Sequence, residues 1–202
     1  LWSHPFPPSI TQSAINSGYS NIRFSANGER AVVPVIGLRK LLVYDFNNQT
    51  GVFSNPKIIS VPDPEVLLDA ELSHAGKRLY YGSYVDQMEG PDYTGVELHN
   101  VFQLDLEAGD VAAIEASRFN MNSFPDRGGC PRRCFILKRT LQAAPDGRIY
   151  ISMRDVDEVE IDRHVNVIEF PDRLREAASY RRNFVTLKEK YKFINVNYIR
   201  SG

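Results

Sequence analysis

The stretch IRFSANGERAVVPV, residues 22–35, consists of an apolar segment, a tight polar turn and a second apolar segment. The same phrase returns as AELSHAGKRLYYGS at residues 70–83 and as TLQAAPDGRIYISM at residues 140–153. The apolar segments alternate or run in β-branched and aromatic residues, and they lack the 3.6-residue period of a helix. This self-similarity predicts a repeat architecture in which each copy forms one structural unit.

A further apolar segment follows each copy and carries an acidic residue near its end, at Asp45, Asp105 and Glu169. These acidic positions are 60 and 64 residues apart. The repeating unit is therefore a small antiparallel sheet, and radial repetition of such sheets gives a β-propeller, which hides most strand edges. We expect an all-β fold: a partial β-propeller of about three to four blades, each a four-stranded antiparallel sheet.

The repeats also predict how the chain is divided. We expect a β-propeller segment over residues 20–202, with blade units at about 20–62, 66–117 and 139–200. Residues 1–19, which contain the SHPFPPS cluster, are expected to be a linker or the remnant of a preceding blade.

Within the units we expect strands near 21–25, 30–36, 40–46, 56–61, 67–72, 78–84, 99–106, 111–116, 139–143, 148–153, 164–170, 184–187 and 193–199. Two insertions interrupt the pattern, at residues 85–100 and 118–138. Residues 171–180 have helical character and could form a short surface helix of two turns.

The turns of the three copies end in Gly28, Gly76 and Gly147. Asn-Gly and Asp-Gly pairs, present in the first and third copies, tolerate positive φ at both centres of a type I′ turn. We therefore expect positive φ at the three glycines, in type I′ or bulged hairpins. The basic residues that follow the turns (Arg30, Arg78, Arg148) are interpreted as solvated strand starts, and the acidic residues that end the third strands as turn formers.

Composition excludes some classes of protein. The chain has 202 residues, 43% of them hydrophobic, and a formal net charge of −1. It can bury a core, and it shows no basic excess of the kind expected at a nucleic-acid interface. No apolar stretch approaches the length of a membrane span. The chain begins at Leu1 without a basic-then-apolar leader, so we expect any secretion signal to be removed or to lie upstream.

Several phrases carry a family resemblance: LLVYDFNNQTGVFSNP (41–56), VFQLDLEAGDVAAIEAS (101–117), LQAAPDGRIYISM (141–153) and VNVIEFPDRLREAASYRRNFVTL (165–187). This series resembles β-propeller modules of secreted and cell-surface proteins from gliding bacteria that use type IX secretion. The resemblance implies an exported chain, secreted or at the cell surface, in a larger protein with further blades upstream. The chain departs from the family in its closing phrase, INVNY at residues 194–198.

An arc of three blades would also be open at both ends. We expect the missing blades to come from the same chain or from another chain, and the sides of the first and last blades to be exposed until they are covered. The apolar residues expected on those sides are Ile22, Phe24, Val43, Val185, Phe193 and Ile199.

The two cysteines, Cys130 and Cys134, lie within GGCPRRC. A thioredoxin-type motif needs two intervening residues, and a structural zinc site needs further ligands nearby. In an exported chain an even number of cysteines in a turn-rich loop favours a local disulfide, with free thiols and then a metal site as alternatives.

Candidate ligand-binding residues lie in the two insertions. One insertion carries a basic patch that could bind an anionic glycan or a protein carboxylate in bidentate geometry, made of Arg127, Arg132, Arg133, Lys138 and Arg139. The ligand-binding candidates among these five are Arg127, Arg132 and Arg133. Asp92 and Tyr93 are the candidates in the first insertion. Loops that project from one rim of a rigid scaffold are where binding function usually lies. A solvated loop is the alternative interpretation of the basic patch.

No metal site or cofactor is expected. The acidic residues between 155 and 162 alternate with apolar ones, lack EF-hand spacing and favour a solvated face over a Ca²⁺ site. No nucleophile elbow and no glycine-rich phosphate loop is present.

Two carboxylates remain as catalytic candidates. Asp69 and Glu71 lie two residues apart on one face of a strand near the expected central channel. Arg23, Glu71 and Gln142 occupy comparable places in the three inner strands, a mixed set without metal-site character. The sequence favours a non-catalytic binding or structural module that mediates protein or glycan interaction. The alternative is a propeller hydrolase of lactonase or glycosidase type acting at the channel.

If the chain is exported, Cys130 and Cys134 should be bonded. So short a loop restrains little of the unfolded chain, so the bond should stabilise the protein by less than the roughly 3 kcal/mol of a fifteen-residue loop. Mass spectrometry after alkylation of unreduced native protein should find no modified thiol, whereas two modified thiols would contradict the bond.

Overall fold

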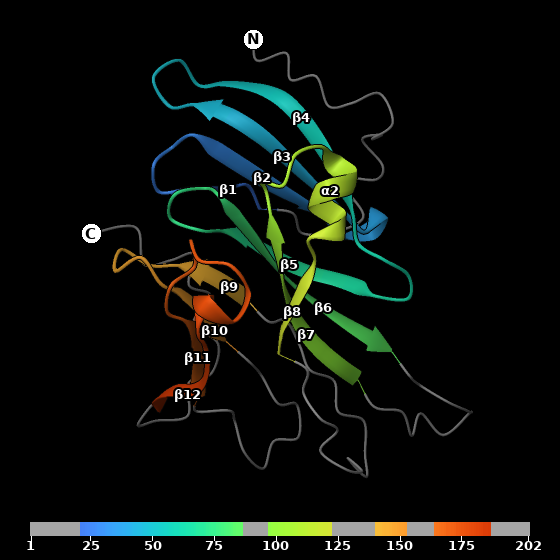
Figure 1. The fold of residues 1–202 in the computed structure, drawn as a ribbon, viewed down its shortest axis with the longest axis vertical. Helices are drawn as coiled ribbons and strands as arrows, with labels where there is room; N and C mark the ends of the chain where they lie inside the picture. The colour runs from blue at the N-terminus through green and yellow to red at the C-terminus, as the bar shows by residue number, and fades with distance from the viewer. Residues whose placement is uncertain (1–20, 87–96, 123–139, 153–163, 187–202) are drawn as a thin grey trace.

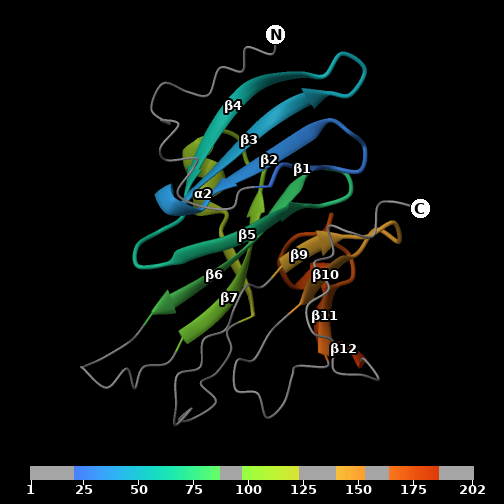
Figure 2. The ribbon, with the colours of Figure 1, turned by 180° about the vertical axis from the view of Figure 1, so that it is seen from behind.

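The computed structural model describes residues 21–86, 97–122, 140–152 and 164–186. These residues form three four-stranded antiparallel sheets, which lie one beside the next (Figures 1 and 2). In each sheet the hydrogen-bonded neighbours follow chain order, so each sheet is a simple meander.

The first sheet contains β1 (Arg23–Phe24), β2 (Arg30–Val35), β3 (Lys40–Asn47) and β4 (Val52–Ser60). The second contains β5 (Val66–Leu72), β6 (Arg78–Asp86), β7 (Glu97–Asp105) and β8 (Phe119–Asn122). The third contains β9 (Thr140–Ala143), β10 (Ile149–Ser152), β11 (His164–Ile168) and β12 (Tyr180–Thr186). In the described part of the chain three short helices connect strands: η1 (Ile36–Leu38), α2 (Val111–Ala116) and η2 (Arg175–Ala178).

The sheets are arranged as blades of a propeller. The innermost strand of the second sheet, β5, contacts β1 and β2 on one side and β9 on the other. At the outside, α2 contacts β4 and η2 contacts β8. Inner strands are therefore adjacent, and each meander runs outward from them. Among the described residues the fold is an all-β, partial β-propeller of three four-stranded blades.

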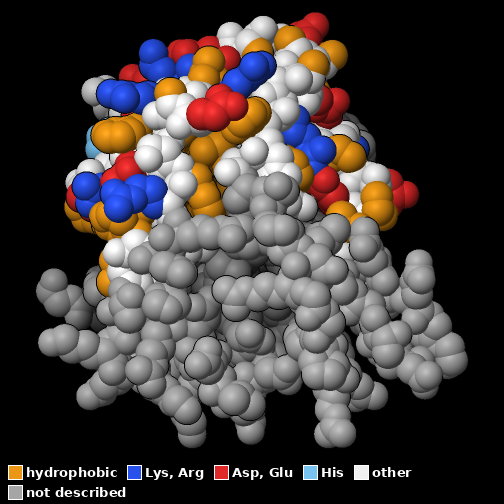
Figure 3. All heavy atoms as spheres, turned by 60° about the horizontal axis from the view of Figure 1, so that its bottom comes forward, with side chains coloured by type: hydrophobic (Ala, Val, Ile, Leu, Met, Phe, Trp, Pro, Cys, Tyr) orange, Lys and Arg blue, Asp and Glu red, His pale blue; other side chains and the backbone are white. Residues whose placement is uncertain are grey.

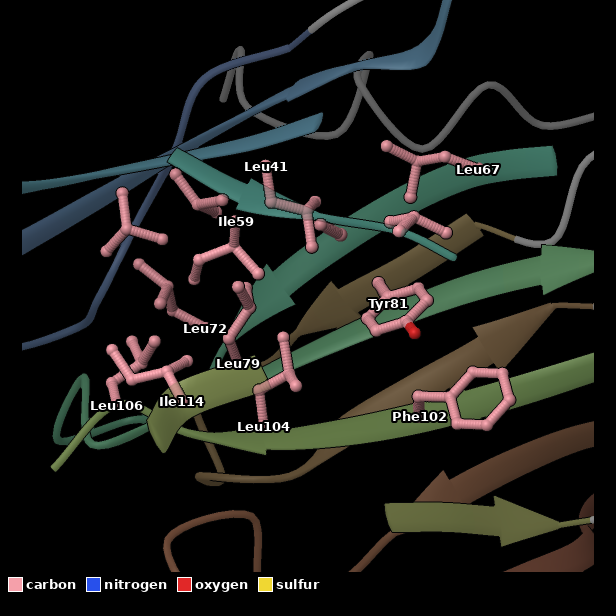
Figure 4. Packing of buried hydrophobic residues seen from close by; sticks show 14 residues of the cluster. Leu41, Ile59, Leu67, Leu72, Leu79, Tyr81, Phe102, Leu104, Leu106 and Ile114 are labelled. Carbon is pink, nitrogen blue, oxygen red and sulfur yellow. The ribbon is translucent and has the colours of Figure 1, made fainter. Parts of the chain in front are cut away.

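Two apolar layers hold the blades together. Between the first and second sheets, Val43 and Ile59 lie in one buried cluster with Leu79, Tyr81 and Leu104 (Figure 4). Between the second and third sheets, Tyr80 and Val101 pack with the isoleucines of β10 and with Ile168. Successive residues of one strand thus pack into opposite apolar layers. This explains why the strand sequences are continuous apolar runs.

One expected strand is a helix. Residues 111–116 form α2, and the outer strand of the second sheet is β8 instead. The Asp110 side chain accepts a hydrogen bond from the Ala113 N–H at 2.9 Å, which caps the helix. The three alanines of VAAIEA favour helix, and Ile114 is fully buried. A short, mostly apolar run fits a strand or a helix by pattern alone, so the sequence interpretation of this segment was wrong.

The end of the third blade also differs from the expectation. The helical stretch expected at 171–180 contains only the single turn η2, and β12 begins at Tyr180 rather than near 184. The strand expected at 193–199 lies outside the described residues. No helix in the described part of the chain is long and apolar enough to cross a membrane.

The three hairpin glycines have positive φ, as predicted: 69° at Gly28, 69° at Gly76 and 80° at Gly147. Each glycine N–H donates to the carbonyl three residues earlier, at 2.9 to 3.0 Å. Asn27 and Asp146 are not among the described residues with positive φ, so the type I′ form is wrong.

Serine hydroxyls complete the first two turns. The Ser25 and Ser73 hydroxyls accept hydrogen bonds from the N–H groups of Arg30 and Arg78, each at 3.0 Å. The third turn is one residue shorter and has alanine at the serine position, and there the Asp146 carboxylate accepts the Arg148 N–H at 3.1 Å. The repeated phrase therefore encodes one turn with two ways of satisfying the same backbone donor.

Some of the apolar residues expected to be exposed on the sides of the first and last blades are exposed in the structure. Ile22, Phe24 and Val185 are exposed by 49%, 44% and 36%. Val43 is only 3% exposed, because it faces the second sheet, so its expected exposure is wrong. Phe193 and Ile199 lie outside the described residues.

Gly147 offers a clean test of backbone strain. A Cβ at this position would meet no atom within 4 Å, so the variant Gly147→Val should suffer only from its positive φ and lose about 1 kcal/mol or more of unfolding free energy. At Gly28 a Cβ would also lie 3.0 Å from the Asn48 Cβ, so Gly28→Ala should cost more than Gly147→Ala. Urea unfolding of the three variants measures this, and wild-type midpoints would contradict the turn assignment.

Candidate functional site

Asp69 and Glu71 lie on β5, the inner strand of the middle blade. Their spacing of two residues places both side chains on the strand face toward the third sheet. Glu71 is 3% exposed, and the Asp69 side chain is 14% exposed. The two carboxylates are therefore buried at the inner ends of two neighbouring blades.

Each carboxylate joins the backbones of two inner strands. The Asp69 carboxylate accepts hydrogen bonds from Ala70 N–H at 2.9 Å and from Leu141 N–H at 3.1 Å. The Glu71 carboxylate accepts from Leu72 N–H at 3.0 Å and from Ala143 N–H at 3.0 Å. In both residues one oxygen receives the N–H of β5 and the other receives the N–H of β9. We call this arrangement the carboxylate bridge.

The first blade contributes a cation to the same place. The Arg23 Nη2 lies 3.6 Å from an Asp69 carboxylate oxygen. Burial raises the pKa of Asp69, and Arg23 opposes that rise. Burial also raises the pKa of Glu71 to about 7, against lowering by its two backbone donors and by Arg23. One guanidinium thus faces two buried carboxylates.

The geometry of the carboxylate bridge bears on whether Asp69 and Glu71 can act as a catalytic pair at the channel. Asp69 and Glu71 are brought together as the sequence predicted, but both oxygens of each already accept backbone hydrogen bonds. An acid or base in catalysis must reach the proton it transfers, and these oxygens are buried against protein. No cluster of three or more metal-ligating side chains occurs among the described residues. The arrangement is suited to holding strands.

The repeated arginines have a structural role as well. Arg30 and Asp45, and Arg78 and Asp105, are direct cross-strand partners in their sheets. The Arg78 guanidinium lies 2.6 Å from the Asp105 carboxylate, and Arg78 is only 8% exposed. The interpretation of Arg78 as a solvated strand start is therefore wrong, because its repeat partner buries it.

A groove lies at the end of the sheets that carries the hairpin turns, which we call the turn rim. It has a volume of about 450 Å³ and opens broadly to solvent. Its walls come from the second and third blades. The lining residues are His74, Pro145, Asp146, Gly147, Glu169, Phe170, Pro171, Asp172 and Arg173, and we call this site the rim groove.

Buried side chains of the second blade fix one wall of the rim groove. The Tyr80 hydroxyl donates to the Pro171 carbonyl at 2.8 Å, and the Gln103 amide donates to the Arg173 carbonyl at 2.7 Å. The Gln103 side-chain oxygen accepts the Arg175 N–H at 2.7 Å. Tyr80 and Gln103 are 0% and 1% exposed, so the loop rests on a rigid support.

The turns of successive blades also hold one another. The Asn27 N–H donates to the His74 carbonyl at 3.4 Å, and the Asn27 amide donates to the Ala75 carbonyl at 3.1 Å. The Ala75 N–H donates in turn to the Asp172 carboxylate at 3.0 Å. The turn rim is therefore connected by hydrogen bonds across the three described blades, and Asp172 of the rim groove takes part.

The candidate ligand residues in the insertions, Arg127, Arg132, Arg133, Asp92 and Tyr93, lie outside the described residues. The same holds for Cys130 and Cys134 and for the acidic run 155–162. Sequence reasoning missed the rim groove. Its signals were the Phe-Pro-Asp-Arg phrase at 170–173, directly after an acidic strand end, and the exposed His74 within the second turn.

Comparison with known proteins identifies no family for this chain. No family model matches the chain, and no curated protein matches it. Among solved structures it is similar to a protein from Lactobacillus plantarum, with 15% identity and a TM-score of 0.42 over 83% of this chain. It is also similar to hydrazine synthase of Kuenenia stuttgartiensis, with 14% identity and a TM-score of 0.42 over 72% of this chain. The chain spans 41% and 38% of the length of these two proteins.

Removing one arm of the carboxylate bridge should destabilise the protein. Glu71→Ala leaves the Leu72 and Ala143 N–H groups without their acceptor, which should lower the unfolding free energy by about 2 kcal/mol or more. Glu176→Ala, which truncates an exposed glutamate of η2, is the matched control and should change it by less than about 0.5 kcal/mol. Equal unfolding midpoints for both variants in urea would contradict a structural role for the bridge.

Proposed function

We propose that this chain is a non-catalytic binding module that holds a protein ligand at the rim groove. The observation that carries the proposal is the pinned loop of the third blade. It presents Phe170, 46% exposed, and Leu174, 43% exposed, beside charged side chains of both signs. Exposed aromatic and aliphatic side chains within a polar surround are typical of protein interaction surfaces.

The charges of the rim groove suit a polar protein segment. Neighbouring donors lower the pKa of Asp146 and of Glu169, so both carboxyls stay ionised at neutral pH. Arg173 lies over the Phe170 ring, with its guanidinium carbon 4.5 Å from the ring centroid. The guanidinium is thus in cation–π contact with the aromatic ring.

The carboxylate bridge supports a binding role over hydrolysis. Asp69 and Glu71 are the acidic pair that a channel hydrolase would need, and their oxygens are engaged by four backbone donors. In Figure 3, which shows one face, basic, acidic and hydrophobic side chains are intermingled over the described part of the view.

We further propose, on the resemblance to exported propeller modules, that the chain acts within a larger secreted or cell-surface protein. Detection of this sequence in the culture medium or on intact cells of its source, with an antibody raised against the purified chain, tests this. Detection in the cytoplasm alone would contradict it.

A random dodecapeptide library displayed on phage is a direct probe of the rim groove. Peptides selected on the wild-type chain should bind Phe170→Ala and Leu174→Ala about 10- to 100-fold more weakly, as expected for loss of an interface anchor. Val52→Ala removes another exposed apolar side chain, 56% exposed, from the first blade and is the matched control.

Equal affinity for the wild type and both loop variants, or failure to select any peptide, would contradict the proposal. A glycan array, run in parallel, tests glycans as the alternative class of ligand. Glycan binding that depends on Phe170, without peptide binding, would reassign the rim groove to carbohydrate.

A further inference from the structure

Within the described part of the chain, the carboxylate bridge has more negative charge than its neighbours neutralise. Asp69 and Glu71 lie on the same strand face, and among the described residues the cation that faces them is Arg23 from β1. The Arg23 Nη2 is 3.6 Å from Asp69, and its buried Nε has no hydrogen-bond partner among those residues. Counted over the described side chains, the ionised pair is therefore one charge in excess at a site that is largely shut off from water.

The described residues of the two other strands next to the pair, β6 and β9, bring no charge that would balance it. From β6, Tyr80 is the direct cross-strand partner of Glu71, and burial raises the pKa of Tyr80 so far that it stays neutral. From β9, the residues Thr140, Leu141, Gln142 and Ala143 carry no titratable side chain. A proton is the smallest species that removes the excess charge without rearranging the backbone.

A single proton also suits the hydrogen-bond geometry. When Glu71 is ionised, both of its oxygens accept backbone N–H groups, and its charge repels that of Asp69 across the same strand face. When Glu71 is protonated, its oxygens keep lone pairs for the Leu72 and Ala143 N–H groups, and the repulsion is gone. Protonation thus keeps the contacts between β5 and β9 and removes the cost of burying a second charge.

We propose that the carboxylate bridge is a proton-dependent clasp between the second and third blades, closed when the pair holds one proton and open to water when both carboxylates are ionised. The clasp acts at the inner end of the interface, where β9 meets β5 through these hydrogen bonds. Opening it exposes the Leu141 and Ala143 N–H groups, while the apolar layer of Tyr80, Ile149 and Ile151 keeps the blades associated.

The direction of the pH effect follows from the raised pKa of Glu71, about 7 against an ordinary 4.5. Below about pH 4.5 the group is protonated in the closed and in the water-exposed state, so it favours neither. Between pH 4.5 and 7 the exposed state loses its proton first, so the closed state becomes progressively less favourable. Above about pH 7 the group is ionised in both states, so the closed state becomes no less favourable as the pH rises further. Asp69 shifts in the same direction.

Amide hydrogen exchange measured by NMR between pH 5 and 8 tests the clasp. After correction for intrinsic rates, protection of the Leu141 and Ala143 amides should fall by at least tenfold across this range. Protection of the Leu42 amide, inside the first sheet between Val33 and Ile58, should stay constant. The variant E71Q keeps an acceptor but cannot ionise, so the fall at Ala143 should shrink to less than threefold.

Constant protection at Leu141 and Ala143 in the wild type would overturn the proposal, and so would an equal fall in E71Q. If E71Q does not fold, the ¹³C shift of the Glu71 carboxyl in the wild type decides. A titration midpoint at least one unit above 4.5 supports the clasp, and a lower midpoint overturns it.

Discussion

The inner edges of a β-propeller are the constraint on which this structure depends. An inner strand pairs with its own sheet on one side only, so its other row of N–H groups must find acceptors or be left unpaired. Here Asp69 and Glu71 supply acceptors for Leu141 and Ala143 and for their own strand at the same time. Charged side chains at an edge thereby become a specific joint between two blades.

The carboxylate bridge positions the parts of the second and third blades that lie farther from the inner strands. With β5 and β9 held together, β6 and β7 of the middle blade face β10 and β11, and Tyr80 and Val101 pack on the third sheet. The same placement lets Tyr80 and Gln103 reach the loop at Pro171 and Arg173. A buried polar network inside the second blade therefore shapes the surface of the third, where the rim groove opens. The shape of the rim groove and the packing of the blades are thus linked through a few buried hydrogen bonds.

Much of the fold could be predicted from the sequence because the fold repeats. Three copies of a turn phrase were enough to predict three sheets and the positive φ of their glycines. The prediction failed where a local signal was ambiguous: VAAIEA is a short, mostly apolar run that fits a strand or a helix, and Asp110 caps it as a helix. It also failed at Val43 and Arg78, since which face or partner buries a residue depends on the neighbouring blade. Propensity and pattern carry no such information.

The site was harder to predict for a physical reason. Asp69 and Glu71 were recognised as a pair on one strand face. Their partners in the next blade, however, are backbone N–H groups 72 residues away, and no side-chain motif indicates such partners. The copies did hold a hint. At the position of Glu71 the other blades carry Arg23 and Gln142, so an acid there is special to the middle blade. The rim groove depends on loops from two blades and could not be read from either one alone.

The two carboxylates accept hydrogen bonds directly from the backbone of the next blade. Scalar couplings across hydrogen bonds, measured by NMR on the ¹³C,¹⁵N-labelled chain, test for these contacts. We expect correlations from the Leu141 amide nitrogen to the Asp69 carboxyl carbon and from the Ala143 amide nitrogen to the Glu71 carboxyl carbon. Amides that exchange rapidly with water and show no such coupling at pH 5 would contradict it.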